Sequence, residues 1–242
     1  MYLKDRVALI TGAGGGIGSA ISLRLAKAGA NLILFGGNNI SNLEKTASAV
    51  RSLGVKVEIL AGDLTDEDFI QKSFKKAVNL FGKIDILINN AGLALNSPLE
   101  STPVQTFDKI MAINVRAPFI LIQNALPVLK ESDRASIINI LSVVAHLGYS
   151  NQSVYSASKH ALLGLTKALA QEVYKDGIRV HAISPGGVYT DMVKVTRPDL
   201  TSDGMIMPED VAEVVEFFLK NRSNAVVDEI LLHRVGKEPF LV

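Results

Sequence analysis

Short apolar runs alternate with longer amphipathic segments along the whole chain, and this alternation restricts the fold more than any other feature. Between the apolar runs, apolar residues recur at helical spacing, most clearly over 69–81 and after Pro208. Repeated strand and helix predict a single-domain, doubly wound α/β fold with a seven-stranded, mainly parallel sheet. The runs typical of strands buried on both faces are 7–10, 32–35, 57–60, 84–88, 137–141, 179–183 and 229–232.

Composition and charge restrict the class of protein to which this chain can belong and the partners that it can bind. With 242 residues and 48% hydrophobic content, the chain can bury a substantial core, and we expect one domain over 1–242. Lys and Arg (25) nearly balance Asp and Glu (24), without a basic stripe or a block of like charge. We therefore expect a small-molecule partner, and neither a nucleic acid nor a membrane.

Cysteine usage and the absence of apolar targeting signals favour a cytoplasmic protein. The chain has no cysteine, which excludes a disulfide framework and a thiolate metal site, and no metal is expected. Met1 is followed within a few residues by Lys4, Asp5 and Arg6 rather than by an apolar signal segment. The stretch 135–158 carries no Asp, Glu, Lys or Arg, but polar residues interrupt it too often for a membrane span. A cytoplasmic location is therefore the expectation.

A glycine-rich loop follows the first predicted strand directly and leads into a helix rich in Ala, Leu and Ile. The loop, 11–18, does not meet the common GxGxxG spacing, but it fits TGxxxGxG through Thr11, Gly12, Gly16 and Gly18. Glycines let backbone amides approach a pyrophosphate, and the positive end of the following helix favours the anion. An ordinary turn or helix cap would show a similar cluster. The position between a strand and a helix favours a dinucleotide-binding loop.

Tyr155 and Lys159 stand four residues apart, which places their side chains on one face of a helix. A free phenol ionises at about pH 10, and a neighbouring ammonium is expected to lower the pKa of Tyr155 toward working pH. Such a pair can pass a proton to or from a substrate. A solvated pair on a helix surface is the alternative. Together with a phosphate-binding loop, the pair indicates hydride chemistry on a nicotinamide cofactor.

These motifs and several others occur in the order found in short-chain dehydrogenases/reductases, and the chain resembles this family over nearly its full length. The matching pieces are 11–18, GlyAspLeu at 62–64, AsnAsnAlaGly at 89–92, Asn114, Ser142, TyrSerAlaSerLys at 155–159 and ProGlyGlyValTyrThr at 185–190. The resemblance implies a Rossmann fold and an NAD(P)-dependent oxidoreductase acting on a carbonyl or secondary alcohol, similar to 3-oxoacyl-acyl-carrier-protein reductases and related carbonyl reductases. It also implies a homodimer or homotetramer. A catalytically silent dinucleotide-binding sensor or scaffold is the alternative.

By this resemblance, several segments of the chain bind the cofactor. Each segment also has a structural explanation: Asp63 can cap a helix that begins at Thr65 or Asp66, and the others can be turns at strand ends. The implied cofactor-binding residues are Thr11, Gly12, Gly14, Gly16, Ile17 and Gly18 in the loop, Asp63 and Leu64 at the adenine, Asn89, Asn90, Ala91 and Gly92 at the adenosine ribose, and Pro185, Gly186, Val188 and Thr190 at the nicotinamide, with Tyr155 and Lys159.

The resemblance also assigns catalytic roles to Asn114, Ser142, Tyr155 and Lys159. Tyr155 would exchange a proton with the substrate oxygen, and Lys159 would keep the phenolate available and bond the nicotinamide ribose. Ser142 would polarise the carbonyl from a strand end. Asn114 would hold a water that links Lys159 to solvent. Taken singly, Ser142 and Asn114 could be helix caps.

Several positions depart from the family's usual pattern. Gly36 stands where NAD-dependent members often carry an acid, and Gly37 where many NADP-dependent members carry Arg. No carboxylate repels a 2′-phosphate there, and the amides of Asn38 and Asn39 can donate to one, so we expect a weak preference for NADP(H) over NAD(H). The other departures are His181, Leu141 and a C-terminal segment without the usual glycines.

The segment between Thr190 and Pro208 is short for a substrate lid, with seventeen residues from 191 to 207. Its stretch 197–204 lacks the apolar periodicity of a stable helix, and we expect a short, mobile lid over an open pocket. Such a lid buries little of a small ligand. His146, Tyr149 and Met192 are candidates to line the pocket, although a His in a loop is more often a surface residue.

Overall fold

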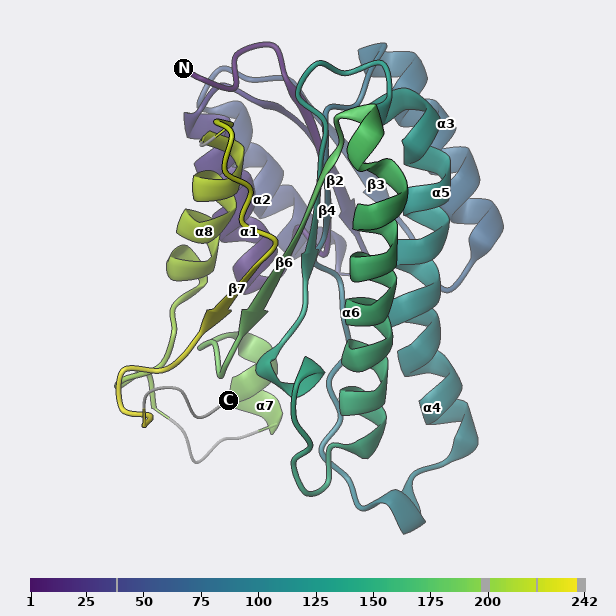
Figure 1. Cartoon of the computed structure of the whole chain (residues 1–242), viewed down its shortest axis with the longest axis vertical. Coiled ribbons are helices and arrows are strands. Elements are labelled where there is room, and N and C mark those ends of the chain that lie inside the picture. Colours follow the sequence, from purple (N-terminus) through teal and green to yellow (C-terminus); the bar gives the residue numbers. More distant parts are fainter. Residues whose placement is uncertain (38, 197–200, 221, 239–242) are drawn as a thin grey trace.

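The computed structural model (Figure 1) describes residues 1–242 except 38, 197–200, 221 and 239–242, and except the side chains of 192, 195 and 196. A seven-stranded sheet stands between two layers of helices, and every pair of neighbouring strands is parallel. The strands are β1 (Val7–Thr11), β2 (Asn31–Gly36), β3 (Val57–Ala61), β4 (Ile86–Asn89), β5 (Ser136–Ile140), β6 (Arg179–Pro185) and β7 (Glu229–Leu232). The α-helices are α1 (Gly16–Lys27), α2 (Ile40–Arg51), α3 (Glu67–Phe81), α4 (Val104–Met111), α5 (Ala117–Leu129), α6 (Ser153–Val173), α7 (Asp191–Thr196) and α8 (Pro208–Lys220); the shorter turns are η1 (Leu99–Ser101), the π-helical η2 (Ala112–Arg116), η3 (Val143–Ala145) and η4 (Tyr174–Asp176).

The prediction of seven strands and of helices over 69–81 and after Pro208 is confirmed, with differences of one or two residues at most strand ends. The sheet is parallel throughout, where the sequence predicted a mainly parallel one. β4 begins at Ile86 rather than at 84. Just before it, the Asp85 carboxylate accepts hydrogen bonds from the Val7 amide at 2.9 Å and from the Arg6 side chain at 3.0 Å. A buried carboxylate thus fastens the start of β4 to β1.

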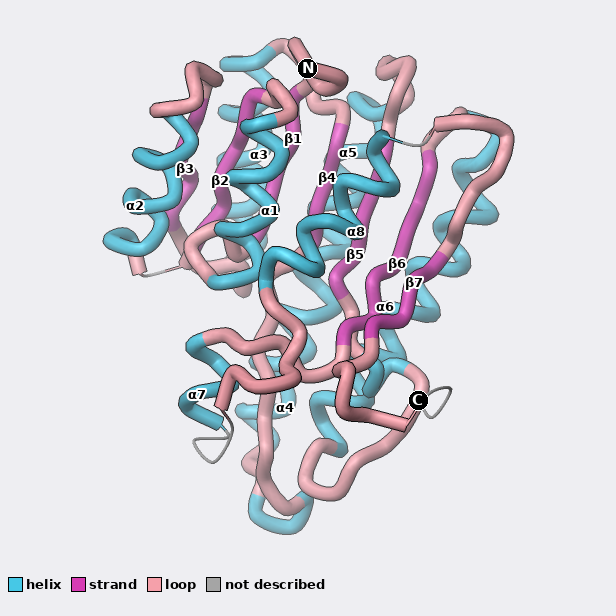
Figure 2. The backbone as a smooth tube through the Cα atoms, turned by 90° about the vertical axis from the view of Figure 1, so that its left-hand side faces the viewer, coloured by secondary structure: helices cyan, strands magenta, loops and turns pink. Residues whose placement is uncertain are grey.

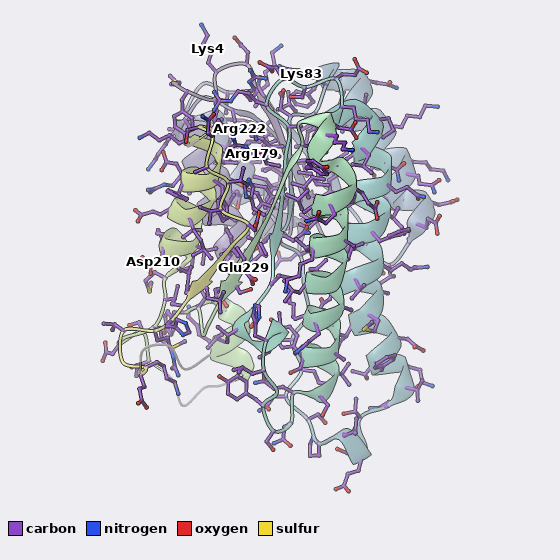
Figure 3. The ribbon with its side chains drawn as sticks, in the orientation of Figure 1. Lys4, Lys83, Arg179, Asp210, Arg222 and Glu229 are labelled. Carbon is purple, nitrogen blue, oxygen red and sulfur yellow. The ribbon has the colours of Figure 1, made fainter. Side chains whose placement is uncertain are left out.

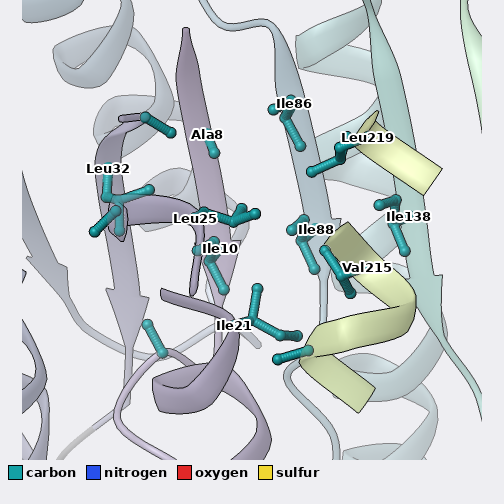
Figure 4. Packing of buried hydrophobic residues seen from close by; sticks show 14 of the residues in the cluster. Ala8, Ile10, Ile21, Leu25, Leu32, Ile86, Ile88, Ile138, Val215 and Leu219 are labelled. Atoms are coloured by element: carbon teal, nitrogen blue, oxygen red, sulfur yellow. The ribbon is translucent and has the colours of Figure 1, made fainter. Parts of the chain in front are cut away.

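Both faces of the sheet are covered, which explains why the strands read as continuous apolar runs (Figure 2). Side chains alternate along β1, so Ala8 and Ile10 face one helical layer and Val7 and Leu9 the other. The first layer consists of α1, α2 and α8, and Figure 4 shows its residues Ile21, Leu25, Val215 and Leu219 against the strands. The second layer consists of α3, α5 and α6.

The strand order, β3-β2-β1-β4-β5-β6-β7, reverses direction between β1 and β4. In open parallel sheets, ligands bind at the carboxyl ends of the strands at such a switch point. The loops after β1 (residues 12–15) and after β4 (residues 90–92) lie there, as do the connections after β5 and β6. The fold therefore brings the sequence motifs to one edge of the sheet, at the bottom of Figure 1.

One helical run, Val104–Leu129, is long and apolar enough by composition to cross a membrane. It comprises α4, η2 and α5, and its side chains Leu121, Ala125 and Leu129 belong to the core between the sheet and the second helical layer. Phe107 and Phe119 are exposed on its outer side. The run is a helix of the folded core that also carries an apolar outer face.

Candidate active site

A cavity of about 680 Å³ opens at the carboxyl edge of the sheet. Its lining comes from Ile17 of the glycine motif, from the segments at the ends of β4, β5 and β6, and from the start of α6. This volume suits a small organic ligand. The sequence-predicted residues that line it are Ile17, Asn90, Gly92, Ser142, Tyr155, Lys159, Pro185, Gly186, Val188 and Thr190.

The glycine loop is packed so closely that its key glycines leave no room for a side chain. Gly12 has a φ of +66°, and a Cβ on Gly18 would lie 2.2 Å from the Gly12 carbonyl oxygen. A Cβ on Gly14 would lie 3.1 Å from the Leu43 amide nitrogen, at the start of α2. Helix α1 begins at Gly16 without a side-chain cap on its amides. Its first turn therefore presents backbone donors and a positive dipole end, as a pyrophosphate requires.

Thr11 and Asn89 are buried and hold the cradle together, while their contact with a cofactor stays a prediction. The Thr11 hydroxyl oxygen accepts from the Asn90 and Ala91 amides, both at 3.0 Å. Asn89 is buried and its side-chain amide donates to Asn139 Oδ1 on β5 at 2.8 Å. The side-chain amide of Asn90 in turn donates to the Thr11 and Gly12 carbonyls. These bonds fix the glycine loop to the loop after β4.

Asp63 and Leu64 lie outside the cavity, after β3. Leu64 is buried in the core, so its side chain is not available to an adenine. Asp63 is exposed, and one of its carboxylate oxygens accepts from the Thr65 amide at 2.8 Å, which lowers the pKa of this carboxyl. The cap of α3 is Asp66, which accepts from the Phe69 amide at 3.2 Å. Asp63 is therefore not the helix cap, and its second oxygen can accept from a ligand.

Asn114 is fully buried in the π-helical turn η2 and is not a helix cap. Its side chain accepts from the Leu93 amide at 2.8 Å and donates to the Leu93 carbonyl and to Ser158 Oγ, both at 2.9 Å. A Cβ on Gly92 would lie 3.3 Å from Asn114 Oδ1 and 3.6 Å from Lys159 Nζ. Asn114 thus holds the loop after β4 in place beside the Lys159 ammonium. Its role in holding a water stays a prediction.

Ser142, Tyr155 and Lys159 converge on the cavity from two elements. Ser142 follows β5 and caps η3 by accepting from the Val144 amide at 3.4 Å, so its role as a cap is also correct. Its side chain is hydrogen-bonded with the Tyr155 hydroxyl. Lys159 Nζ lies 5.8 Å from the centre of the Tyr155 ring and donates to the Ile140 carbonyl at 2.9 Å. The hydroxyls of Ser142 and Tyr155 can therefore contact one ligand oxygen between them.

Burial controls the protonation of this cluster, and it overturns the expected direction for Tyr155. Burial raises the pKa of Tyr155, and the hydrogen bond with Ser142 opposes this only in part. Burial also lowers the pKa of Lys159 from 10.5 to about 8. The prediction that the pKa of Tyr155 is lowered is wrong for this structure, because burial is the largest influence on the phenol. At neutral pH the phenol is protonated and able to donate.

Two of the three candidate pocket residues can be placed. Tyr149 lines the cavity as predicted. The His146 side chain is instead directed to the sheet, with Nε2 2.7 Å from Glu229 Oε1, and Ser184 Oγ donates to the same oxygen at 2.6 Å. Figure 3 labels Glu229 on β7. The Met192 side chain lies outside the described residues.

The lid segment begins with the six-residue helix α7, next to the glycine loop: a Cβ on Gly16 would lie 3.1 Å from Thr190 Cγ2. Its second half returns along the Pro–Gly–Gly turn, where Tyr189 donates to the Ile206 carbonyl and Ile206 to that of Gly187. The predicted non-helical stretch 197–204 falls partly outside the described residues, at 197–200. The expected mobility of the lid remains a prediction.

Sequence reasoning missed a second group of cavity residues. The loop after β4 contributes Leu93, Ala94, Leu95 and Asn96, and the segment after β7 contributes His233, Arg234, Lys237 and Glu238. The sequence does contain a signal for the residues after β7. Residues that follow the last strand of a parallel sheet must emerge at the same edge as those after β1 and β4.

The fold and this cavity together define a class of protein, a nicotinamide-dependent oxidoreductase of the Rossmann type. Comparison with known proteins gives the family. A sequence model described as short chain dehydrogenase matches residues 6–201. The chain belongs to the short-chain dehydrogenase/reductase family, and it is an NAD(P)-dependent oxidoreductase that acts on a carbonyl or a secondary alcohol.

Characterised relatives and solved structures resemble the chain over most of its length. Levodione reductase of Leifsonia aquatica is 36% identical over 220 residues, which cover 89% of this chain and 79% of that protein. A 3-oxoacyl-acyl-carrier-protein reductase of Thermotoga maritima is 33% identical over 241 residues, covering 96% and 97%. A metagenomic short-chain oxidoreductase in complex with NADP superposes with a TM-score of 0.84 at 28% identity, covering 96% and 98%. A Mycobacterium paratuberculosis short chain dehydrogenase bound to NAD superposes with a TM-score of 0.87 at 29% identity, covering 96% and 97%.

Proposed function

We propose that the chain acts as a carbonyl reductase or alcohol dehydrogenase in which Tyr155 is the general acid and base, with Ser142, Lys159 and Asn114 supporting it. One observation carries this proposal: Ser142, Tyr155 and Lys159 meet in one cavity, which Ile17 of the glycine motif also lines. All these residues belong to one domain, which we take to be the whole chain, 1–242. The chemistry requires no metal.

In the reductive direction, the chain has to deliver a proton to the substrate oxygen. A bound nicotinamide coenzyme supplies the hydride, which goes to the carbonyl carbon. The Tyr155 hydroxyl donates its proton to the oxygen as the C=O π bond breaks, and Ser142 donates a hydrogen bond that polarises it. Lys159 stabilises the phenolate that results. In the reverse direction Tyr155 must first lose its proton, and its raised pKa makes this less favourable at neutral pH.

A coenzyme-consumption assay on a panel of ketones and secondary alcohols separates this proposal from the alternative of a silent sensor. The enzyme is expected to oxidise a reduced coenzyme in the presence of some carbonyls and not in their absence. A sensor would bind the coenzyme, as seen by quenching or calorimetry, without consuming it on any member of the panel. That second result would overturn the proposed activity.

We infer a small preference for NADP(H) over NAD(H). Gly36 carries no carboxylate that would repel a 2′-phosphate, and a Cβ there would lie 2.7 Å from Leu43 Cδ2, so a side chain at this position would require Leu43 to move. Asn39 Oδ1 accepts from the Asn42 amide at 3.2 Å as the cap of α2, which leaves the Asn39 side-chain N–H groups for a ligand. Asn38 lies outside the described residues. One similar structure holds NADP and another NAD, so these relatives support a dinucleotide without deciding between the two.

The ratio of kcat/KM for the two coenzymes tests this inference. We expect NADPH to be favoured by less than roughly tenfold, because no Arg is present to form a bidentate pair with the phosphate. Gly37 has open space around it, so Gly37→Arg should increase the ratio, while Gly164→Arg, also in open space but exposed on α6, should leave it unchanged. A wild-type preference for NADH would contradict the inference.

We propose a homo-oligomer in the cytoplasm, with the outer face of α4 and α5 as an interface between copies. Val104, Phe107 and Phe119 are 69%, 41% and 49% exposed on this face. Large exposed apolar side chains on one face indicate a contact surface. Phe119→Glu is expected to shift the protein from dimer or tetramer toward monomer in sedimentation velocity. A monomeric wild-type protein at micromolar concentration would contradict this proposal.

A further inference from the structure

Beyond the coenzyme and catalytic residues, the segment after β7 places a cationic side chain in the cavity. We propose that Arg234, assisted by Lys237, binds an anionic group of the substrate, a carboxylate or a phosphate, so that the preferred substrates are carbonyl compounds that carry such a group away from the reacting carbon. This inference rests on the proposed function and adds the substrate class to it.

The fold fixes the position of Arg234. β7 is paired with β6 so that Leu232 lies opposite Pro185, and the Gly186 amide donates to the Leu232 carbonyl at 2.8 Å. Arg234 follows two residues later, and a Cβ on Gly187 would lie 3.6 Å from Arg234 Cδ. The stem of Arg234 therefore crosses the Pro–Gly–Gly turn, which lines the cavity. The chain then turns, with the Lys237 amide donating to the Arg234 carbonyl at 2.9 Å, and Lys237 also lines the cavity.

The guanidinium of Arg234 has donors to spare. It is half-buried, and the one hydrogen bond described for it goes to the Met205 sulfur at 3.3 Å, which is a weak acceptor. Within the described part of the chain, no ion pair involves Arg234 or Lys237, whereas Arg6 and Arg24 each bond two carboxylates. A guanidinium offers five N–H donors in a planar fork that matches a carboxylate or phosphate. A substrate anion would supply the missing acceptors.

The charge of the cavity favours the same ligand. Among the described lining residues the charged side chains are Lys159, Arg234, Lys237 and Glu238, which are three cations and one carboxylate. Lys159 stands beside Tyr155 in the catalytic cluster, while Arg234 and Lys237 lie on the segment after β7. A partly enclosed cavity with an excess of positive charge concentrates anionic ligands. A ligand oxygen between Ser142 and Tyr155 leaves the far part of the same molecule within the cavity that Arg234 borders.

The test uses matched substrates. Linear oxoacids that differ in the number of methylenes between ketone and carboxylate are each compared with their methyl ester, and an oxoalkyl phosphate is compared with the corresponding hydroxyketone. For the spacing that fits best, wild-type kcat/KM should favour the anion over its neutral partner by roughly tenfold to hundredfold, as a charge-assisted bidentate bond allows. The phosphate arm shows which anion is preferred.

Variants of Arg234 assign the preference to this residue. Arg234→Met keeps the stem over Gly187 but removes the charge, and it should reduce kcat/KM for the anion to that for the ester while the ester changes by less than about threefold. Arg234→Lys should keep part of the preference, because it keeps the charge without the fork. Arg51→Gln, which removes an exposed cation at the end of α2, is the control and should change neither substrate.

The outcomes separate this inference from the proposed function. Turnover of neutral and anionic ketones at equal kcat/KM by the wild-type enzyme would overturn the anion site and leave the oxidoreductase activity intact. An equal loss for both partners in Arg234→Met, with a higher KM for the coenzyme, would also overturn it by showing that Arg234 serves the coenzyme. No turnover of any carbonyl would overturn the proposed function and, with it, this substrate class.

Discussion

Replacing Tyr155 by Phe is expected to lower kcat for carbonyl reduction by at least roughly a hundredfold, while coenzyme binding changes little. The phenol is hydrogen-bonded with Ser142, and burial keeps it protonated at neutral pH. The variant retains the ring, so it loses the transferable proton and one hydrogen bond but creates no cavity. Steady-state kcat with a substrate from the panel, together with a coenzyme titration by fluorescence, measures both quantities.

The control for this substitution is Tyr174→Phe, which removes a hydroxyl from the far end of the same helical run. Tyr174 is 62% exposed and lies at the start of η4, directly after α6. Its loss should leave kcat unchanged. Turnover of Tyr155→Phe within about threefold of wild type would show that another group supplies the proton.

The fold was predictable because the physical cause of each strand is visible in the sequence. A strand covered by helices on both faces is apolar at nearly every position, and the runs at 7–10 and 32–35 are apolar throughout. The glycine loop was predictable for a related reason. Its sequence permits the positive φ at Gly12 and the close approach of Gly18 to the Gly12 carbonyl.

It was less predictable which site residues face a ligand and which hold the loops together, because this depends on which side chains lie next to one another in the folded chain. Thr11 and Asn89 lie in coenzyme motifs, yet their hydrogen bonds tie strand ends together. His181 is one of the departures from the family's usual pattern. Its ring is buried and stacked on Phe218 with 4.3 Å between ring centres, and burial lowers its pKa to about 4. The solvent exposure of each side chain decides these outcomes, and the spacing of residues in the sequence does not reveal it.

The same limit explains the error over Tyr155. Spacing in a helix correctly placed Lys159 beside the phenol, at 5.8 Å from the ring centre. It could not show that the protein removes both groups from water, which disfavours the phenolate and the ammonium alike. The Lys159 ammonium is the more costly of the two at neutral pH, because it stays charged at 4% exposure.

Lys159→Met is therefore expected to lose turnover by at least roughly a hundredfold and to weaken coenzyme binding, yet to be more stable than wild type at pH 7. The pKa of Lys159 is lowered from 10.5 to about 8, which corresponds to ~3 kcal/mol of destabilisation when the group is charged in both the folded and unfolded states. Loss of the hydrogen bond to the Ile140 carbonyl costs about 1 kcal/mol in return. The net gain in free energy of unfolding should be roughly 2 kcal/mol, measured by urea denaturation.

The pH dependence of that gain identifies its cause. Between pH 8 and 10.5 the unfolded chain still binds the Lys159 proton while the folded chain releases it, so the stability of the wild-type protein rises with pH through this window. Methionine does not titrate, and all other groups are shared, so the advantage of the variant should be largest below pH 8 and disappear by about pH 10. Lys167→Met, at an exposed position of the same helix, is the control and should show no such trend. A stability difference that does not change with pH would mean that methionine stabilises the protein through its volume alone. The buried ammonium of Lys159 would then not destabilise the folded state.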